Sequence, residues 1–193
     1  MTNNLQQEKL CQISQQGMRQ AAQMLSRLLR QNIEVEVANV LLSDCKKVLD
    51  AEAEQQLGIY LQVTGEVNGG MLLTFSKECA AWLCGRLLGT TSDNLLVEPA
   101  SSTLREVGNI MASSFLASID EQLGLRALPS PPQLHCAPLK ELLQRCQLAS
   151  GEDCLIVQTR LLGEAGADGR LQGAIYLLPQ TVALEKLREQ IDG

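Results

Sequence analysis

The sequence contains few residues of the types that build the commonest catalytic and stacking sites. Its 193 residues include one histidine, His135, and aromatic residues make up 3%. A single histidine does not support a multi-histidine metal site or a Ser-His-Asp triad. So few aromatic rings argue against platforms on which bases or sugars stack. No second catalytic partner can be named for His135 or for a cysteine nucleophile, so the sequence does not favour an enzyme of that kind.

Positive charge is also scarce. The chain has 16 lysines and arginines against 22 acidic residues, which gives a net charge of −6. A nucleic-acid binder needs a basic surface to replace phosphate counterions, and anionic membranes attract basic segments. We therefore expect neither a nucleic acid nor a membrane among the partners. Residues 1–10 lack the pattern of a secretory signal, and the apolar runs are shorter than the ~20 residues of a membrane span, so we predict a cytoplasmic protein.

Cysteine is present, but not in the patterns of a disulfide framework or a zinc site. The seven cysteines are an odd number, and no two have C-x-x-C spacing. We therefore expect no metal site and no disulfide network, but core or partly exposed thiols in a reducing compartment. The seven positions are Cys11, Cys45, Cys79, Cys84, Cys136, Cys146 and Cys154.

Apolar periodicity and turn residues predict the same series of elements twice. Each series has a long helix, an extended segment, two strands and a final helix. In the first series these are a helix over 5–31, a strand over 32–42, strands over 59–65 and 71–75 joined by Asn68-Gly69-Gly70, and a helix from Ser76 to Leu88. In the second they are a helix over 102–123, an extended segment over 128–134, a short helix over 138–146, strands over 154–162 and 171–178 flanking a turn at 166–169, and a helix over 179–191.

The repeat indicates a duplicated architecture. With an offset of 94, Leu10 aligns with Leu104 and Leu25 with Ile119, although any two amphipathic helices would align to some degree. We predict an α+β fold of one domain, residues 1–193. Its two pseudo-symmetric halves, 5–89 and 101–193, would each have the order helix, strand, hairpin, helix. They would share one mostly antiparallel sheet with the two long helices packed side by side on one face.

The second long helix carries a polar face with a distinctive spacing. Ser102, Glu106, Asn109 and Ser113 follow one another at intervals of four, three and four residues, on one face away from the apolar stripe. A carboxamide both donates and accepts hydrogen bonds, so it can orient a water molecule, and a carboxylate can pair with a cation of a partner. Gly108 costs about 1 kcal/mol of helix stability and suggests that another backbone comes close. On its own, a solvated helix face could carry the same residues.

The full pattern resembles the signature of a known family. Ser-x3-Glu-x2-Asn, followed after 22 residues by Pro, is met by Ser102, Glu106, Asn109 and Pro132. This is similar to the signature of the CheC-type phosphatases of bacterial chemotaxis, a family that includes CheX and the flagellar-switch protein FliY. The stretches 106–116 and 123–132 are also similar to that family's second-half helix and to the segment after it. The resemblance covers essentially the whole chain, because CheC proteins consist of two such halves.

The resemblance implies a phosphatase that acts on the aspartyl phosphate of a CheY-like response regulator. Asn109 would position the attacking water, and Glu106 would bind the lysine of the regulator's active site. Ser102 and Pro132 would support the site, as an N-cap or surface contact and as a fixed turn. The chain would bind no cofactor of its own, because Mg²⁺ would be held by the regulator. Since the substrate is a protein, we expect Glu106 and Asn109 on an open surface.

The first half departs from the signature. The offset of 94 places Gln12, Gln15 and Ala38 at the positions of Glu106, Asn109 and the signature proline. Many CheC proteins carry E-x-x-N in both halves, so we predict one active site here, in the second half. The alternative is a non-catalytic module of the chemotaxis or flagellar-switch machinery that binds CheD or a response regulator, with the degenerate half as a docking surface. CheD is thus a second partner that the resemblance suggests.

Overall fold

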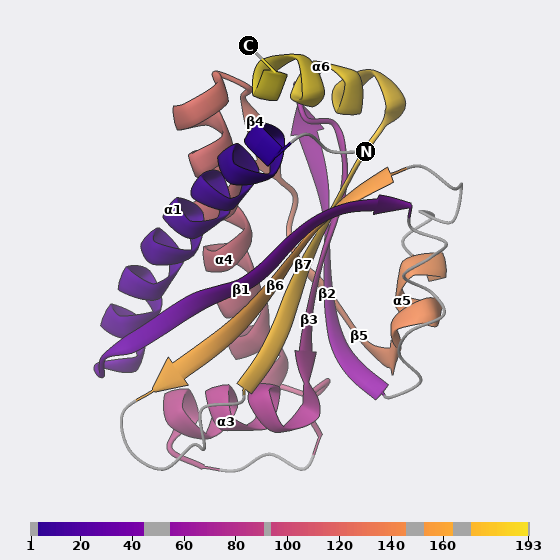
Figure 1. Cartoon of the computed structure of the whole chain (residues 1–193). Helices are drawn as coiled ribbons and strands as arrows, with labels where there is room; N and C mark the ends of the chain where they lie inside the picture. Colours follow the sequence, from indigo (N-terminus) through magenta and orange to yellow (C-terminus); the bar gives the residue numbers. More distant parts are fainter. Residues whose placement is uncertain (1–3, 45–54, 91–93, 146–152, 164–170, 193) are drawn as a thin grey trace.

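The computed structural model describes residues 4–44, 55–90, 94–145, 153–163 and 171–192 (Figure 1). The predicted turn at 166–169, Cys45 and Cys146 lie outside these residues. Helices and strands follow one another in the predicted order, with ends that differ by a few residues. They are α1 (Asn4–Leu29), β1 (Ile33–Asp44), β2 (Gln55–Gly65), β3 (Gly69–Ser76), α3 (Lys77–Leu88), α4 (Ala100–Leu123), β4 (Ala127–Pro129), β5 (Gln133–Pro138), α5 (Leu139–Arg145), β6 (Asp153–Gly163), β7 (Leu171–Pro179) and α6 (Thr181–Asp192).

The ends of α3 and α4 show why the turn residues predicted them well. The Ser76 side chain accepts a hydrogen bond from the Cys79 N–H at 3.1 Å and caps α3. Gly89 and Gly124 end α3 and α4 in the left-handed conformation, with φ of 68° at both positions. Only glycine adopts this conformation without steric cost, so both helices end where the sequence indicated.

The strands form one seven-stranded antiparallel sheet. Its order is β1-β6-β7-β3-β2-β4, and β5 also pairs with β2. Exchanging each strand for its counterpart in the other half, β1 for β4 and β5, β2 for β6 and β3 for β7, gives the same order reversed. An approximate two-fold axis therefore passes between β3 and β7. The sheet is curled (Figure 1), and the predicted α+β fold of two pseudo-symmetric halves is confirmed.

The two long helices lie together on one face of the sheet (Figure 1). They come close where α1 has a glycine: a Cβ on Gly17 would lie 2.9 Å from the Cα of Phe115 in α4. Side chains of both helices and of the sheet form one buried core, which includes Leu25, Phe115 and Ile59. A second, smaller core on the opposite face packs α5 against the strands. None of the helices in the described ranges is long and apolar enough to cross a membrane.

Candidate functional site

Helix α4 presents the predicted residues on its outer side. Glu106 is exposed and Asn109 is partly exposed, whereas Val107 and Gly108 between them are buried against the sheet. A Cβ on Gly108 would lie 2.7 Å from the Cγ2 atom of Ile59 in β2. The glycine thus allows a close approach, but to a side chain; the predicted approach of another backbone was wrong. The close packing against β2 fixes the direction in which Glu106 and Asn109 project.

The segment 129–132, where the pairing along β2 is interrupted, faces this helix. Residues 129–132 comprise the last residue of β4 and the three residues that join β4 to β5, and both strands pair with β2. Ser130 anchors the segment: its N–H donates to the Gln62 carbonyl at 2.8 Å, and its Oγ accepts from the Gln62 N–H at 2.9 Å. Pro131 and Pro132 have no N–H to donate to a ladder, so regular pairing stops between the two strands. The prolines are held there by the serine beside them.

The structure brings all four signature residues to one place. An open groove of about 410 Å³, the signature groove, runs between α4 and the 129–132 segment. Its described lining consists of Ser102, Arg105, Glu106, Asn109, Pro129, Ser130, Pro131 and Pro132. The side chains of Glu106 and Asn109 form no hydrogen bond or ion pair with other residues that the structure describes. They are therefore available to a partner, as expected for a site that acts on a protein.

Ser102 does not have its predicted capping role. Helix α4 begins at Ala100, its N-cap is Pro99, and no side chain of the N-cap residue bonds to the helix. Ser102 lies in the first turn, where its N–H donates to Glu98 Oε2 at 3.1 Å and its hydroxyl donates to the Pro99 carbonyl at 3.0 Å. A carboxylate from outside the helix thus accepts from a first-turn amide, and the N-cap interpretation of Ser102 was wrong. Its exposed position in the groove agrees with the other option, a surface contact.

Arg105 is a groove residue that the signature does not contain. Its Nη2 atom contacts Glu98 Oε1 and lies 3.2 Å from Ser101 Oγ. Hydrogen bonds from Ser102 and Ser101, together with the Arg105 guanidinium, hold the pKa of the Glu98 carboxyl below its ordinary value. A helical spacing of four residues from Asn109 could have indicated that Arg105 shares its face.

In the first half, the three described residues that correspond to the signature, Gln12, Gln15 and Ala38, do not lie together. Gln12 and Gln15 line a separate hollow of about 550 Å³ whose described lining is glutamine and one arginine, with no carboxylate. Gln15 Nε2 lies 3.5 Å from the Sγ of Cys11. Ala38 does not line this hollow. It lies at an irregularity in the pairing of β1 with β6 and lines a hollow on the opposite side of the sheet.

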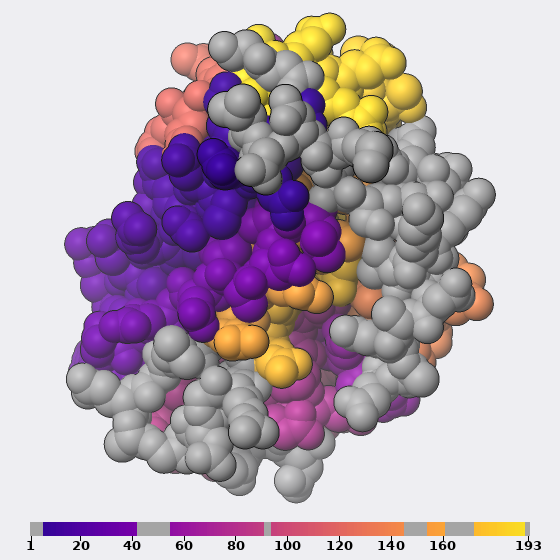
Figure 2. All heavy atoms as spheres, viewed as in Figure 1, coloured from indigo at the N-terminus to yellow at the C-terminus, as the bar shows by residue number. Residues whose placement is uncertain are grey.

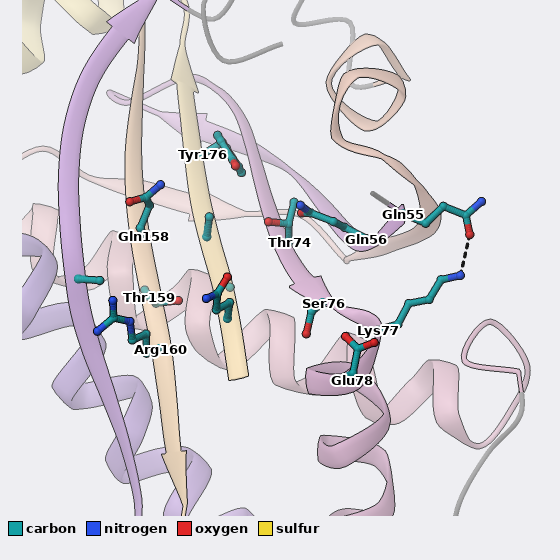
Figure 3. A pocket seen from close by; sticks show the side chains of 14 residues that line it. Gln55, Gln56, Thr74, Ser76, Lys77, Glu78, Gln158, Thr159, Arg160 and Tyr176 are labelled. Carbon is teal, nitrogen blue, oxygen red and sulfur yellow. Dashed lines mark hydrogen bonds between the residues drawn. The ribbon is translucent and has the colours of Figure 1, made fainter. Parts of the chain in front are cut away.

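That opposite hollow is larger, about 580 Å³, and lies over the face of the sheet away from α1 and α4 (Figure 3). Atoms of the second-half strands, orange and yellow, reach the surface at the centre of Figure 2. Lys77 Nζ donates to Gln55 Oε1 at 2.6 Å, and Arg160 Nη1 lies 3.7 Å from Glu36 Oε2. The described lining contains no histidine, cysteine or signature residue, and a solvated polar face is ordinary for an antiparallel sheet. Size alone therefore does not make it the site.

The other chemistry considered from the sequence finds no support in the site. His135 and Cys136 lie on β5, and neither lines the signature groove. Cys79 and Cys84 are buried in the core, and burial raises the pKa of both thiols, which opposes a nucleophilic role. Within the described ranges, no group of three or more histidine, cysteine or acidic side chains could hold a metal ion.

Comparisons with known proteins agree with the signature. A family model described as the CheC-like family matches residues 100–135, which include α4, β4 and the 129–132 segment. Over 194 residues, 94% of this chain and 91% of the relative, the sequence is 25% identical to the protein named CheY-P phosphatase CheC of Bacillus subtilis (strain 168). The resemblance to CheC-type proteins is thereby confirmed.

Solved structures show the same fold. FliY of Thermotoga maritima has a TM-score of 0.78 at 19% identity, covering 100% of this chain and 98% of that chain. CheX of Borrelia burgdorferi, solved as a CheX-CheY-BeF3-Mg²⁺ complex, has a TM-score of 0.54 at 18% identity, covering 85% of this chain and 96% of that chain. The likeness extends over nearly the whole length of each protein, although few residues are identical.

Proposed function

We propose that this chain, whose sequence and fold are similar to those of CheC-type proteins, is a phosphatase for the aspartyl phosphate of a CheY-like response regulator. The observation that carries the proposal is the signature groove. Pro132 lies 23 residues after Asn109 in the sequence, yet both line one open groove with Glu106, and the two polar side chains have no described partner within the fold.

The reaction needs orientation more than it needs new covalent chemistry. A water oxygen attacks phosphorus, the bond between phosphorus and the aspartate oxygen breaks, and the products are a free carboxylate and inorganic phosphate. Asn109 can accept a hydrogen bond from the water and donate one to it, which holds the water in line with that bond. Glu106 can pair with a lysine of the regulator and so fix how the two proteins dock. Phosphoryl transfer is accelerated by this kind of positioning and by electrostatic stabilisation.

Among the described residues that line the groove, neither hydroxyl is hydrogen-bonded to a side chain that could act as its base. The two hydroxyls of the groove already take part in the local structure: Ser102 donates to the Pro99 carbonyl, and Ser130 accepts from the Gln62 N–H. No histidine, cysteine or lysine is among the described lining residues. A covalent route through the chain would therefore lack an activated group. Attack by a water molecule suits the residues that are present, and the Mg²⁺ of the reaction would be bound by the regulator.

The relatives support the substrate and the partner. The Bacillus subtilis relative is named a CheY-P phosphatase, and the Borrelia CheX structure contains CheY with BeF3 and Mg²⁺. An open groove on the surface also fits a protein substrate better than a small molecule, which would usually be enclosed by its pocket. Binding of CheD stays a prediction.

The test is release of phosphate from a phosphorylated CheY-like protein of the same organism, measured with and without this chain. Asn109→Ala should lower the rate on the order of a hundredfold, because the water is no longer oriented. Glu106→Ala should lower the rate mainly by weakening productive docking. Gln15→Ala is the matched control, since it removes the carboxamide at the equivalent position of the first half, and it should leave the rate unchanged within about twofold.

Two outcomes would contradict the proposal. If Asn109→Ala is fully active while its circular dichroism spectrum is unchanged, the groove is not the catalytic site. If the unmodified chain binds the activated regulator without accelerating phosphate release, the chain is the non-catalytic binding module that we named as the alternative.

A further inference from the structure

The proline wall of the signature groove, residues 129–132, is a bulge in the strand that pairs with β2. Along this pairing β2 advances three residues, from Val63 to Tyr60, while the other strand advances four, from Pro129 to Gln133. β4 and β5 are therefore parts of one edge strand with one extra residue between them. A bulge bends the strand that contains it and is common beside active sites, where it directs a side chain.

Ser130 fastens this bulge through its side chain. In a regular antiparallel sheet, two residues of a hydrogen-bonded pair exchange both of their N–H···O=C bonds. The Ser130 N–H donates to the Gln62 carbonyl at 2.8 Å, as in a regular pair. The return bond is different, because the Gln62 N–H donates to Ser130 Oγ at 2.9 Å. The hydroxyl thus takes the place of the backbone acceptor, and the main chain is free to leave the ladder at this residue.

The first half has a bulge at the equivalent place without this fastening. The pairing of β1 with β6 shifts register around Ala38, which corresponds to Pro132 by the offset of 94. Ser130 corresponds to Glu36, whose carboxylate lies 3.7 Å from the guanidinium of Arg160 on β6. The bulge therefore belongs to the repeated fold and forms without a serine or a proline. The fastened proline wall is particular to the half that carries the signature.

Both sides of the signature groove are held by the same strand. Helix α4 is set against β2 by the close contact of Gly108 with Ile59, which fixes the direction of Asn109. The proline wall is set against β2 by the hydrogen bonds between Ser130 and Gln62. β2 is thus the common base from which the distance between Asn109 and the wall is fixed. Loss of the Ser130 hydroxyl would loosen the wall alone and leave α4 in place.

We propose that Ser130 is a positioning residue of this site. By fastening the proline wall to β2, its hydroxyl fixes how a loop of the partner enters the groove, and hence where the phosphoryl group lies relative to Asn109. Ser130 acts through the wall and takes no part in the chemical step. The inference rests on the proposed function, because it takes the partner to be a phosphorylated receiver domain. A reaction that depends on orientation is sensitive to such a wall, since a displacement of about 1 Å can lower the rate about a hundredfold.

The experiment measures steady-state phosphate release from a phosphorylated CheY-like receiver, and binding of the full chain to the same receiver activated by beryllofluoride with Mg²⁺. Ser130→Ala should lower kcat about tenfold, because fewer bound complexes have the water aligned. Kd should change by less than about threefold, since the docking side chains are all present. Ser130→Thr keeps the Oγ atom and should restore kcat to within about twofold. Urea unfolding would show that each variant is folded under the assay conditions.

A second measurement reports on the fastening without any need for activity. Hydrogen exchange followed by NMR should show the Gln62 amide exchanging about tenfold faster in Ser130→Ala, because its acceptor is gone. The amide of Ile59, which lies in the same strand beyond the bulge, should be unchanged. Ser130→Thr should protect the Gln62 amide as the unmodified chain does.

The chain supplies a matched control and a coupled variant. Thr64→Val removes a hydroxyl that also joins β2 to β4, 3.4 Å from the Leu128 carbonyl, at a point where the ladder is regular. It should leave kcat unchanged within about twofold. Pro131→Gly loosens the wall while the Ser130 hydroxyl is still present, and should lower kcat by a similar factor to Ser130→Ala. The two losses should not multiply in the double variant, because both act through the same wall.

The outcomes separate this inference from the proposed function. Normal kcat in Ser130→Ala, or an equal loss in Thr64→Val, overturns the inference and leaves the phosphatase proposal intact. A tenfold rise in Kd with normal kcat also overturns it, since Ser130 would then be a binding contact. So does a Ser130→Thr variant that protects the Gln62 amide but keeps the low kcat. If the losses of Ser130→Ala and Pro131→Gly multiply, Ser130 does not act through the wall and the inference fails. If the unmodified chain releases no phosphate, the proposed function fails and this inference fails with it.

Discussion

Replacing Gly108 by alanine would test how tightly α4 lies against the sheet beneath the signature groove. A Cβ at this position would be 2.7 Å from Cγ2 and 2.9 Å from Cδ1 of Ile59, distances that real Cβ contacts essentially never show. Ile59 is fully buried in β2, between β3 and β5, so it has little freedom to move. The added methyl group must therefore push α4 away from the sheet.

Two opposing terms set the expected change in the free energy of unfolding. Alanine is a better helix former than glycine by about 1 kcal/mol, whereas inserting a methyl group into a filled core typically costs about 1–3 kcal/mol. We expect Gly108→Ala to destabilise the protein by about 1 kcal/mol. Gly85→Ala in α3 is the matched control, because a Cβ there meets nothing within 4 Å. It should stabilise the protein by about 1 kcal/mol.

Urea unfolding followed by circular dichroism would measure both changes in the free energy of unfolding. In thermal unfolding, the two variants should differ in Tm by about 4–8 °C. Gly108→Ala should also slow phosphate release, because moving α4 changes the groove while Glu106 and Asn109 are both still present. Ile59→Ala should cost less stability in the Gly108→Ala background than in the unmodified chain, since it removes the clash. If Gly108→Ala stabilises the protein as much as Gly85→Ala does, the tight contact with Ile59 is wrong.

Three further predictions concern other parts of the chain. Gln12→Glu combined with Gln15→Asn would rebuild the polar pair of the first half, and phosphate release should rise by less than about twofold because the counterpart of the proline wall is missing there; a larger rise would mean that the wall is dispensable. The pKa of Glu98 is lower in the folded protein than its ordinary value, so its contribution to stability is present at neutral pH and is lost as the pH falls through the lowered pKa. The difference in urea midpoint between the unmodified chain and Glu98→Gln should therefore shrink between pH 7 and pH 3, and a constant difference would contradict this. Burial, and secondarily Glu78, raises the pKa of Cys79 to about 12, so its thiol should resist iodoacetamide at pH 8 until the protein unfolds, as mass spectrometry would show.

The sequence predicted the elements better than it predicted their neighbours. Turn residues such as Gly89 and Gly124 fix helix ends locally, and apolar periodicity shows which side of an element is buried. Neither signal states which strand lies beside which. The pairing of β1 with β6 connects residues more than a hundred positions apart, and only the repeated order of elements hinted at it.

The candidate site shows the same limit. The signature gave Asn109 and Pro132, but their proximity depends on Ser130, which fastens the proline segment to Gln62 of β2. Ser102 was expected to cap the helix because serine often does so. In the structure the helix begins two residues earlier, at Ala100, so Ser102 lies in the first turn and its N–H donates to Glu98. The spacing of apolar residues does not decide on which of several neighbouring residues a helix begins. Arg105 could not be singled out from the sequence, because a charged residue on an exposed helix face looks the same whether it contacts a partner or only water.

The strand order has a consequence for how the chain holds together and how it can change. Because β6 and β7 lie between β1 and β3, the first half is not a contiguous sheet, and the second half is divided in the same way. Neither fragment would bury its own core alone, so each should behave as an incomplete piece that requires its complement, and unfolding should be cooperative across both. Because the strands of the two halves alternate in the sheet, the first half is needed for folding whether or not it has an active site. The first half can lose its surface signature and still be retained, because its strands remain the support on which the other half is built.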